Sequence, residues 1–138
     1  WHWHPSNQVS IQKSGIVETN NDRGNLIIVP VGVSDWKVDL VKGQETPTIQ
    51  GWYSKVYNTF EPNPTTIYSR QLKADDTFVW VLWPSEGKAP KIRTEILSKD
   101  ANSVKVRVSD TQKRHWDITV PFADSSKAEV KLVSQEDK

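Results

Sequence analysis

The chain has 138 residues, with 18 basic and 17 acidic side chains, a net charge of +1 and no cysteine. A chain of this length can bury a core of its own, and the lack of cysteine excludes a disulfide scaffold, a thiolate metal site and a cysteine nucleophile. Its longest unbroken apolar run, Phe78–Trp83, has six residues, whereas a membrane-spanning helix needs about 20, so no membrane partner is expected.

The two ends of the chain indicate how the protein is processed and where it is ordered. The chain begins with tryptophan and contains no methionine, so we expect a processed or excised piece of a longer product. The opening residues Trp1–Pro5 lack the charged, apolar and small-residue regions of a signal peptide, which places any targeting signal upstream. We expect one domain over residues 1–138, with the polar residues 134–138 frayed.

Strand patterns recur along the chain, whereas helical periodicity is almost absent. In chain order, apolar and polar residues alternate in 35–41, 92–96, 104–108, 116–120 and 130–132. Each of these segments is expected to have one face in solvent. Two runs, Leu26–Val29 and Phe78–Trp83, are continuously apolar and are therefore expected as central strands that are covered on both faces. The turn-rich residues 109–113 predict a hairpin between the segments on either side of them.

Proline and glycine separate these short segments at near-regular intervals. About ten short strands with such turn signals are typical of two packed antiparallel sheets. The sequence therefore predicts an all-β fold, an antiparallel β-sandwich.

A pair of histidines opens the chain. His2 and His4 would point to one face of an extended strand, about 6.5 Å apart, which is compatible with a shared metal. The only other histidine is His115, and no carboxylate follows His4 within the next ten residues. We therefore expect a structural or interface role for the pair, and assign no metal and no cofactor. The patterns of a nucleophile elbow, a dinucleotide-binding loop and a phosphate-binding loop are absent too, so no catalytic residue is assigned.

The chain is rich in tryptophan, with seven residues of this type. Trp80 and Trp116 lie in strand patterns and are expected in the core. Trp52, Tyr53 and Tyr57 lie in a segment that alternates less plainly. Exposed aromatic rings there would stack on sugar rings or form an interface, and packing within a loop cluster is the alternative. These three are candidate substrate-binding residues.

Basic residues are concentrated in the segment 88–115, which holds 8 basic and 3 acidic side chains and so carries +5. If folding gathers the cations on one face, that face would attract polyanions at low salt. A solvated hairpin surface is the alternative. Lys105, Arg107, Lys113 and Arg114 are candidate substrate-binding residues in this segment. Nucleic acid is not an expected partner, because the whole chain is nearly neutral and carries no recognition motif.

Five segments occur in an order that resembles a known family. They are Trp1–His4, Gly51–Ser54, Tyr57, Glu61–Pro64 and Phe78–Pro84. Together they are similar to the C-terminal part of heparinase II/III-type polysaccharide lyases. The resemblance covers the first 84 residues and is confined to general strand character beyond them.

The resemblance implies a fold and an activity. It implies that the chain is the antiparallel β-sandwich of a secreted or periplasmic lyase, which cleaves acidic, uronate-containing and in some cases sulfated glycans by β-elimination. The catalytic side chains of the family lie in an N-terminal α/α-toroid of the same parent chain. Elimination needs convergent acidic and basic groups in a closed cleft, so the isolated chain is not expected to be active.

The resemblance also bears on individual residues. It implies that Trp52, Tyr53 and Tyr57 lie near the rim of the cleft or against the toroid. In some relatives a histidine pair is followed closely by aspartate and glycine, whereas His4 is followed by Pro5–Gln8, so no metal or catalytic role is transferred to the histidines. The alternative function is a free-standing carbohydrate-binding or adhesion module.

Overall fold

Twelve strands and two short 3₁₀-helices make up the described part of the computed structural model, which comprises residues 1–33, 35–72, 74 and 76–133. The strands are β1 (Val9–Ile11), β2 (Val17–Thr19), β3 (Asn25–Val31), β4 (Lys37–Val41), β5 (Trp52–Tyr53), β6 (Glu61–Pro62), β7 (Thr65–Ser69), β8 (Val79–Ser85), β9 (Arg93–Lys99), β10 (Ser103–Ser109), β11 (His115–Pro121) and β12 (Glu129–Val133), with η1 (Lys13–Gly15) and η2 (Ser125–Lys127) between them. The predicted fraying of 134–138 lies outside the described residues. No helix in the described part is long and apolar enough to cross a membrane.

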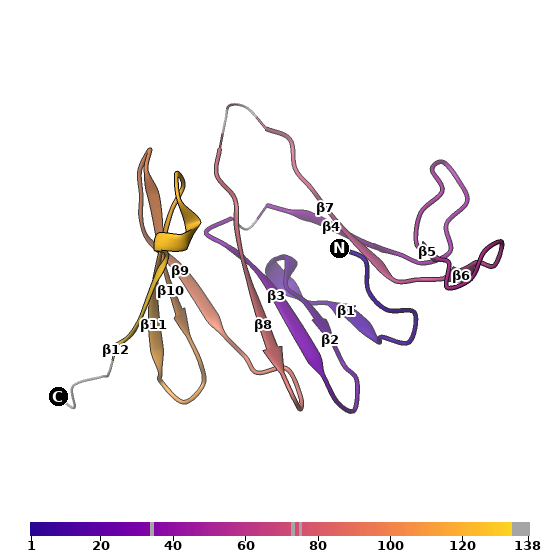
Figure 1. Ribbon diagram of the computed structural model, residues 1–138, viewed down its shortest axis with the longest axis horizontal. Helices are drawn as coiled ribbons and strands as arrows, with labels where there is room; N and C mark the ends of the chain where they lie inside the picture. The colour runs from indigo at the N-terminus through magenta and orange to yellow at the C-terminus, as the bar shows by residue number, and fades with distance from the viewer. Residues whose placement is uncertain (34, 73, 75, 134–138) are drawn as a thin grey trace.

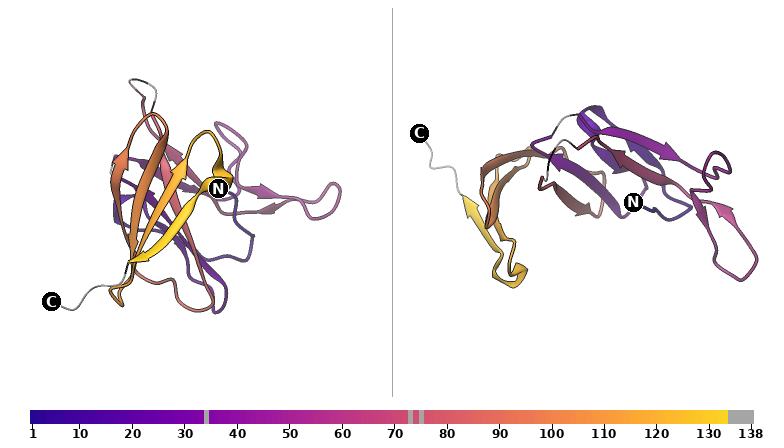
Figure 2. Two further views of the ribbon diagram at one scale, coloured as in Figure 1. Left: turned by 60° about the vertical axis from the view of Figure 1, so that its left-hand side comes forward. Right: turned by 90° about the horizontal axis from the view of Figure 1, so that it is seen from above.

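Two four-stranded antiparallel sheets pack together (Figures 1 and 2). The first sheet has the order β1-β2-β3-β8 and the second has the order β12-β11-β10-β9. The predicted all-β fold, an antiparallel β-sandwich, is confirmed. The predicted hairpin is β10–β11, in which Val104 lies opposite Val120 and Val108 lies opposite Trp116.

The main core lies between the two sheets. It is built from the inward-facing positions of β3 and β10, where every second residue points to the same side. Ile27, Val29 and Val31 of β3 and Val104, Val106 and Val108 of β10 are all buried in one cluster. Apolar burial between the two inner faces is therefore what holds the sandwich together.

A second core lies on the opposite face of the first sheet, beneath the two-stranded sheet β4–β7 and the N-terminal segment. Its buried members are Trp3, Val17 and Ile28. The Trp3 indole Nε1 donates to Thr66 Oγ1 at 2.7 Å, which fixes the N-terminal segment along β7. Strand β3 is thus covered on both faces and paired on both edges, so the prediction that Leu26–Val29 forms a central strand is confirmed.

The other continuous apolar run, Phe78–Trp83, was predicted to be central, and that prediction is wrong. It forms most of β8, which pairs with β3 alone among the described strands and so ends the first sheet. Its run is apolar because each face meets a core: Val81 and Trp83 pack on the main core, and Trp80 packs on the second. An edge strand between two cores has the same composition as a central one.

An arm, residues 42–64, connects β4 to β7 and projects from the sandwich (Figures 1 and 2). The short strands β5 and β6 pair along it, so part of the predicted loop Glu61–Pro64 is strand. At its base, the backbone N–H groups of Gly43 and Asn63 both donate to the Gly51 carbonyl, at 2.8 and 2.7 Å. The arm is therefore a hydrogen-bonded extension of the β4–β7 pair.

Candidate functional site

The three aromatic residues predicted to bind substrate all lie on the arm, but their environments differ. Trp52 is half-buried, and its indole Nε1 donates to the Gln44 carbonyl at 3.0 Å. Tyr53 is exposed, with its ring centroid 6.2 Å from that of His4. Tyr57 is 99% exposed at the end of the arm. Trp52 therefore holds the arm together, while the two tyrosines are available to a partner.

Apolar side chains accompany these tyrosines on the arm. The exposed large hydrophobic residues there are Ile49, Tyr53, Val56, Tyr57 and Phe60, and we call them the arm surface. Four of them lie in the β5–β6 hairpin and Ile49 lies in the loop before it, and exposed apolar residues so close in the chain are candidates for an interaction site. Sequence reasoning missed three of the five, although apolar residues within a turn-rich segment were a signal that could have found them.

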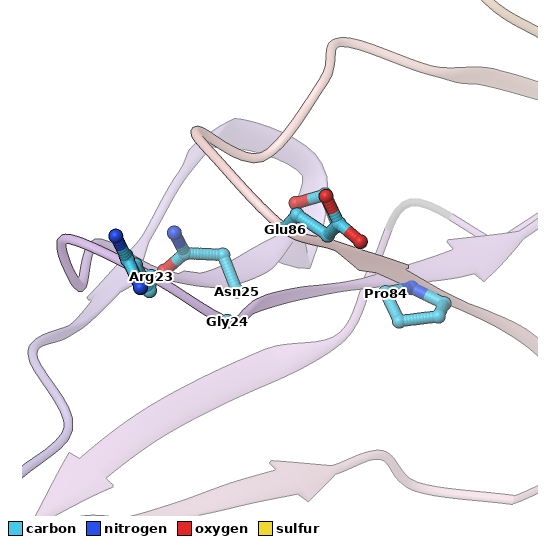
Figure 3. A pocket seen from close by; sticks show the side chains of 6 residues that line it. Arg23, Gly24, Asn25, Pro84 and Glu86 are labelled. Carbon is cyan, nitrogen blue, oxygen red and sulfur yellow. The ribbon is translucent and has the colours of Figure 1, made fainter.

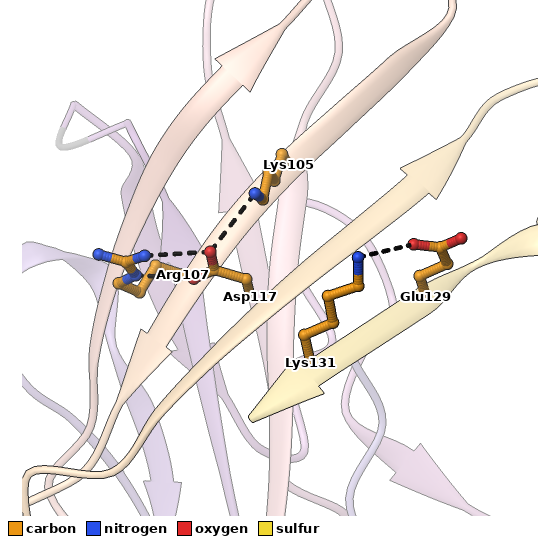
Figure 4. Close-up of polar contacts among 5 residues, drawn as sticks. All are labelled: Lys105, Arg107, Asp117, Glu129 and Lys131. Carbon is orange, nitrogen blue, oxygen red and sulfur yellow. Dashed lines mark hydrogen bonds and ion pairs between the residues drawn. The ribbon is translucent and has the colours of Figure 1, made fainter. Parts of the chain in front are cut away.

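Two of the predicted basic residues lie on the outer face of the second sheet, where they are already paired (Figure 4). Arg107 binds the Asp117 carboxylate through Nε at 2.7 Å and Nη2 at 3.0 Å, and Lys105 Nζ lies 3.4 Å from the same group. The strand register extends this alternation of charge across all four strands. One residue from each strand lies in the same row, in the order Glu95, Arg107, Asp117 and Lys131. Opposite charges in neighbouring positions stabilise a sheet.

We call this row of four alternating charges the ladder, and it predicts how the stability of the fold depends on pH. The Arg107 guanidinium, with a smaller contribution from Lys105, holds the pKa of the Asp117 carboxyl below its ordinary value. In the unfolded chain that pKa is about 3.9, so the stabilisation is complete above about pH 4 and is lost as the pH falls from there through the lower folded pKa. Asp117→Asn should therefore flatten the loss of stability in acid, measured as the urea midpoint at a series of pH values.

A matched control for this prediction is Asp22→Asn, because Asp22 is exposed and makes no ion pair within the described residues. The control should keep the acid dependence of the unmodified chain. An Asp117→Asn variant with that same dependence would show that the ladder is not linked to folding.

The other two predicted basic residues lie in the β10–β11 turn. Arg114 is paired, since its Nε donates to Asp110 Oδ2 at 2.7 Å and its guanidinium lies 5.3 Å from the Trp116 ring centroid. Lys113 makes no ion pair within the described part and lines a hollow that Lys91 and Arg93 also line. The structure therefore separates the predicted basic block into a neutralised ladder and a smaller group of unpaired cations.

A groove lined by aromatic residues lies beside β7, with a volume of about 360 Å³. Trp1, Trp36, Tyr68 and Trp80 line it, and the Trp36 ring centroid is 5.2 Å from that of Trp80 and 6.0 Å from that of Tyr68. The Trp80 Nε1 atom is buried without a hydrogen-bond partner in the described residues. We call this site the aromatic groove.

The aromatic groove combines flat apolar rings with a few polar groups. His2, Gln50, Thr65 and Thr66 also line it. Such a combination suits ligands that have one apolar face and several hydroxyl groups, as sugar rings do. Sequence reasoning did not find the groove, because its residues come from the N-terminal segment and several strands, and no local pattern joins them.

A hollow of about 760 Å³ lies where β3 begins and β8 ends (Figure 3). Asn25 lines this hollow and is buried, and its side-chain Nδ2 donates to the carbonyls of Asn21 and Gly87, each at 2.9 Å. Its Oδ1 accepts from the Asn21 backbone N–H at 2.7 Å. Because these bonds tie two turns together, Asn25 is a structural residue, and Arg23 and Glu86 remain as the charged residues of an open surface.

The two N-terminal histidines have separate partners. His2 Nδ1 lies 3.2 Å from Thr65 Oγ1, and His4 Nδ1 lies 2.7 Å from Ser6 Oγ. In the described residues, no group of three or more histidine, cysteine, aspartate or glutamate side chains could hold a metal ion.

Three surfaces thus remain as candidates: the arm surface, the aromatic groove and the hollow beside Lys113. No family model, curated protein or solved structure matches the chain. The resemblance to heparinase II/III-type lyases therefore stays a prediction from the sequence.

Proposed function

We propose that this chain is the non-catalytic β-sandwich of a heparinase II/III-like polysaccharide lyase. It supports an N-terminal α/α-toroid, which cleaves acidic, uronate-containing glycans, and it contacts the glycan itself. The parent protein is secreted or periplasmic. The observation that carries the proposal is the arm surface, which belongs to the part of the chain that resembles the family.

The arm surface supports a domain contact on energetic grounds. Tyr57 is 99% exposed, and Ile49, Val56 and Phe60 are exposed with it on a segment that projects from the sandwich. Full burial of one such side chain contributes about 1.5–3 kcal/mol, so a partner domain that covers several of them would be held firmly. The backbone hydrogen bonds at the base of the arm keep it extended and available.

The chemistry of elimination supports a non-catalytic role for the sandwich. The reaction needs a base for the C5 proton, a group that neutralises the uronate carboxylate and an acid for the leaving oxygen. Tyr68 is the phenol that lines the aromatic groove, and its hydroxyl donates to the Gly15 carbonyl at 2.7 Å. Burial raises the pKa of Tyr68 far above its ordinary value, so the phenol stays protonated at neutral pH and is not available to accept the C5 proton.

A free-standing carbohydrate-binding module is the second candidate, and the aromatic groove favours it. Its four aromatic rings and the polar side chains beside them suit a sugar ring without any partner domain. This function requires only the chain itself, whereas the first requires a toroid.

The discriminating experiment is an assay for unsaturated uronate products. We expect none from the isolated chain, and we expect release from the parent protein that contains the toroid. In that parent, Tyr57→Ala with Phe60→Ala should lower activity roughly tenfold or more, because losing about 1.5–3 kcal/mol per side chain at the contact loosens it. Product release by the isolated chain, or a gene that encodes no toroid, would overturn the proposal.

A matched control exists on β12, where Val130 and Leu132 are also exposed. Changing both to alanine removes exposed apolar groups at a distance from the arm, and should leave activity unchanged. For the second candidate, titration of the isolated chain with an uncharged oligosaccharide should shift the indole signals of Trp36 and Trp80, and flat spectra would dismiss it.

A further inference from the structure

A hollow with unpaired cations lies at one end of the second sheet, where β9 begins and the β10–β11 turn closes. It has a volume of about 450 Å³, which is within the range of small-molecule sites. Register brings three of its residues into one row, because Ser109 lies opposite both Arg93 and His115. We call it the basic hollow; the residues that line it with donor groups are Lys91, Arg93, Ser109, Thr111, Lys113 and His115.

The charge of the basic hollow is not neutralised within the described part of the chain. Lys91, Arg93 and Lys113 have no carboxylate within 4.0 Å there. One carboxylate, Asp110, also lines the hollow, but its side chain is only 5% exposed and is held by Arg114. Three unpaired cations around one hollow attract an anion more strongly than the same cations scattered over a surface.

Asp110 is further occupied by its own turn. Its Oδ1 accepts from the backbone N–H groups of Gln112 and Arg114, at 2.8 and 3.0 Å, and its Oδ2 accepts from the Arg114 side chain. These bonds fix the turn that carries Lys113. The carboxylate therefore organises the hollow, and its charge is balanced by Arg114.

The backbone of Lys113 has a conformation that is unusual for a residue with a side chain. Its φ is +62°, in the left-handed region that glycine and asparagine occupy most easily. A residue with a side chain costs roughly 1–2 kcal/mol there. The turn would close more easily with glycine, yet this position holds a lysine that lines the basic hollow.

Neutral donors complete the hollow. Ser109 Oγ lies 2.7 Å from His115 Nδ1. When the serine hydroxyl donates to Nδ1, the neutral imidazole carries its proton on Nε2, which leaves a ring N–H for another acceptor. Thr111 adds a hydroxyl group at the turn. Lysine, arginine, hydroxyl and imidazole donors together match the acceptor-only surface of a sulfate group.

We propose that the basic hollow binds a sulfate group of an acidic polysaccharide, with Lys91, Arg93 and Lys113 as its charged ligands. The identity of the polysaccharide rests on the proposed function. The hollow lies on the second sheet, whereas the arm that would contact the toroid extends from the β4–β7 pair, so we assign it to retention of the glycan chain and not to the scissile bond. It extends the role of the sandwich from support to substrate retention.

The test is titration calorimetry of the 138-residue chain with a heparan-sulfate hexasaccharide at about 0.15 M salt, where long-range attraction is screened. Changing Lys91, Arg93 and Lys113 to glutamine should weaken binding roughly tenfold, since each exposed ion pair contributes modestly to affinity and three are lost together. The control changes Lys13, Arg23 and Lys55 to glutamine. It removes the same residue types and the same charge outside the hollow, and should bind within about twofold of the unmodified chain.

A single substitution separates the ligand role of Lys113 from folding. Lys113→Gly removes the charge and relieves the left-handed backbone, so affinity should fall while the thermal midpoint stays equal or rises. An unsulfated hyaluronan hexasaccharide, which has carboxylates alone, should bind the unmodified chain more weakly than the sulfated one. Equal binding of a DNA oligonucleotide would overturn the proposal in favour of general attraction to polyanions.

The outcomes distinguish this proposal from the proposed function. If the triple variant and its control bind the sulfated hexasaccharide equally, the basic hollow is not a site, while the lyase assay of the parent protein is unaffected. If the triple variant loses binding but the parent protein releases no unsaturated uronate, the hollow stands and the lyase function fails.

Discussion

Replacing Ile28 with alanine is expected to destabilise the fold by about 2–5 kcal/mol, the usual cost of truncating a fully buried isoleucine. Ile28 is 1% exposed and lies in the middle of β3. It packs against Val17 and Trp3 in the second core, while its neighbours in β3 pack in the main core. The loss should appear as a lower urea midpoint with an unchanged slope.

The matched control is Leu82→Ala. Leu82 lies opposite Ile28 in the register of β3 and β8, so the two side chains share a face of the first sheet. Leu82 is 45% exposed because β8 is an edge strand, and its truncation should cost less than half as much. A loss for Ile28→Ala as small as that expected for Leu82→Ala would mean that the second core contributes little to folding.

The contrast between β3 and β8 shows what the sequence could predict about the fold. Leu26–Val29 and Phe78–Trp83 are alike in hydrophobicity, and hydrophobicity reports whether the faces of a strand are covered. It does not report whether the edges are paired, because edge pairing uses backbone groups that every residue has. The sequence therefore predicted strands, the β10–β11 hairpin and the sandwich, but not the position of β8.

Strand β12 shows a similar limit. The alternation in 130–132 predicted one face in solvent. In the structure Val130 and Leu132 are both exposed, because β12 ends the second sheet. A pattern assigns a side chain to a face, but the extent of the opposite layer decides whether that face is covered.

The candidate sites were partly predictable for related reasons. Tyr57 was predicted to be available for contact, because it lies where alternation fails, and it is exposed. Arg107 and Asp117 are ten residues apart, and only the register of β10 on β11 shows that they form an ion pair. The excess of cations in 88–115 was visible in the sequence, while the division into a neutralised ladder and an unpaired group depends on which carboxylate lies across each strand.

Changing Gly51 to alanine is expected to disrupt the base of the arm. The φ of Gly51 is +75°, and a Cβ atom there would lie 3.0 Å from three backbone atoms: the Asn63 carbonyl oxygen, the Gly43 nitrogen and the Lys42 Cα. The backbone conformation alone costs an alanine about 1–2 kcal/mol. The close contacts of the new Cβ atom add to this cost, because backbone atoms cannot move aside by changing rotamer as a side chain can. Gly43 and Asn63 also donate the hydrogen bonds to the Gly51 carbonyl that fix the base of the arm. These hydrogen bonds should therefore weaken.

Gly24→Ala is the control that separates the cost of the backbone conformation from the cost of the close contacts. The φ of Gly24 is +68°, close to that of Gly51, but a Cβ atom there would meet nothing within 4 Å. Gly24→Ala should therefore show the backbone cost alone. Gly51→Ala should in addition speed amide exchange at Gly43 and Asn63 and shift the Trp52 indole signal, because the hydrogen bond from Trp52 to Gln44 depends on the arm. If both variants lose the same stability and leave Trp52 unchanged, the arm is not fixed at Gly51. In that case the arm surface would not be held in place for a partner, and the domain contact that we propose would lose its structural basis.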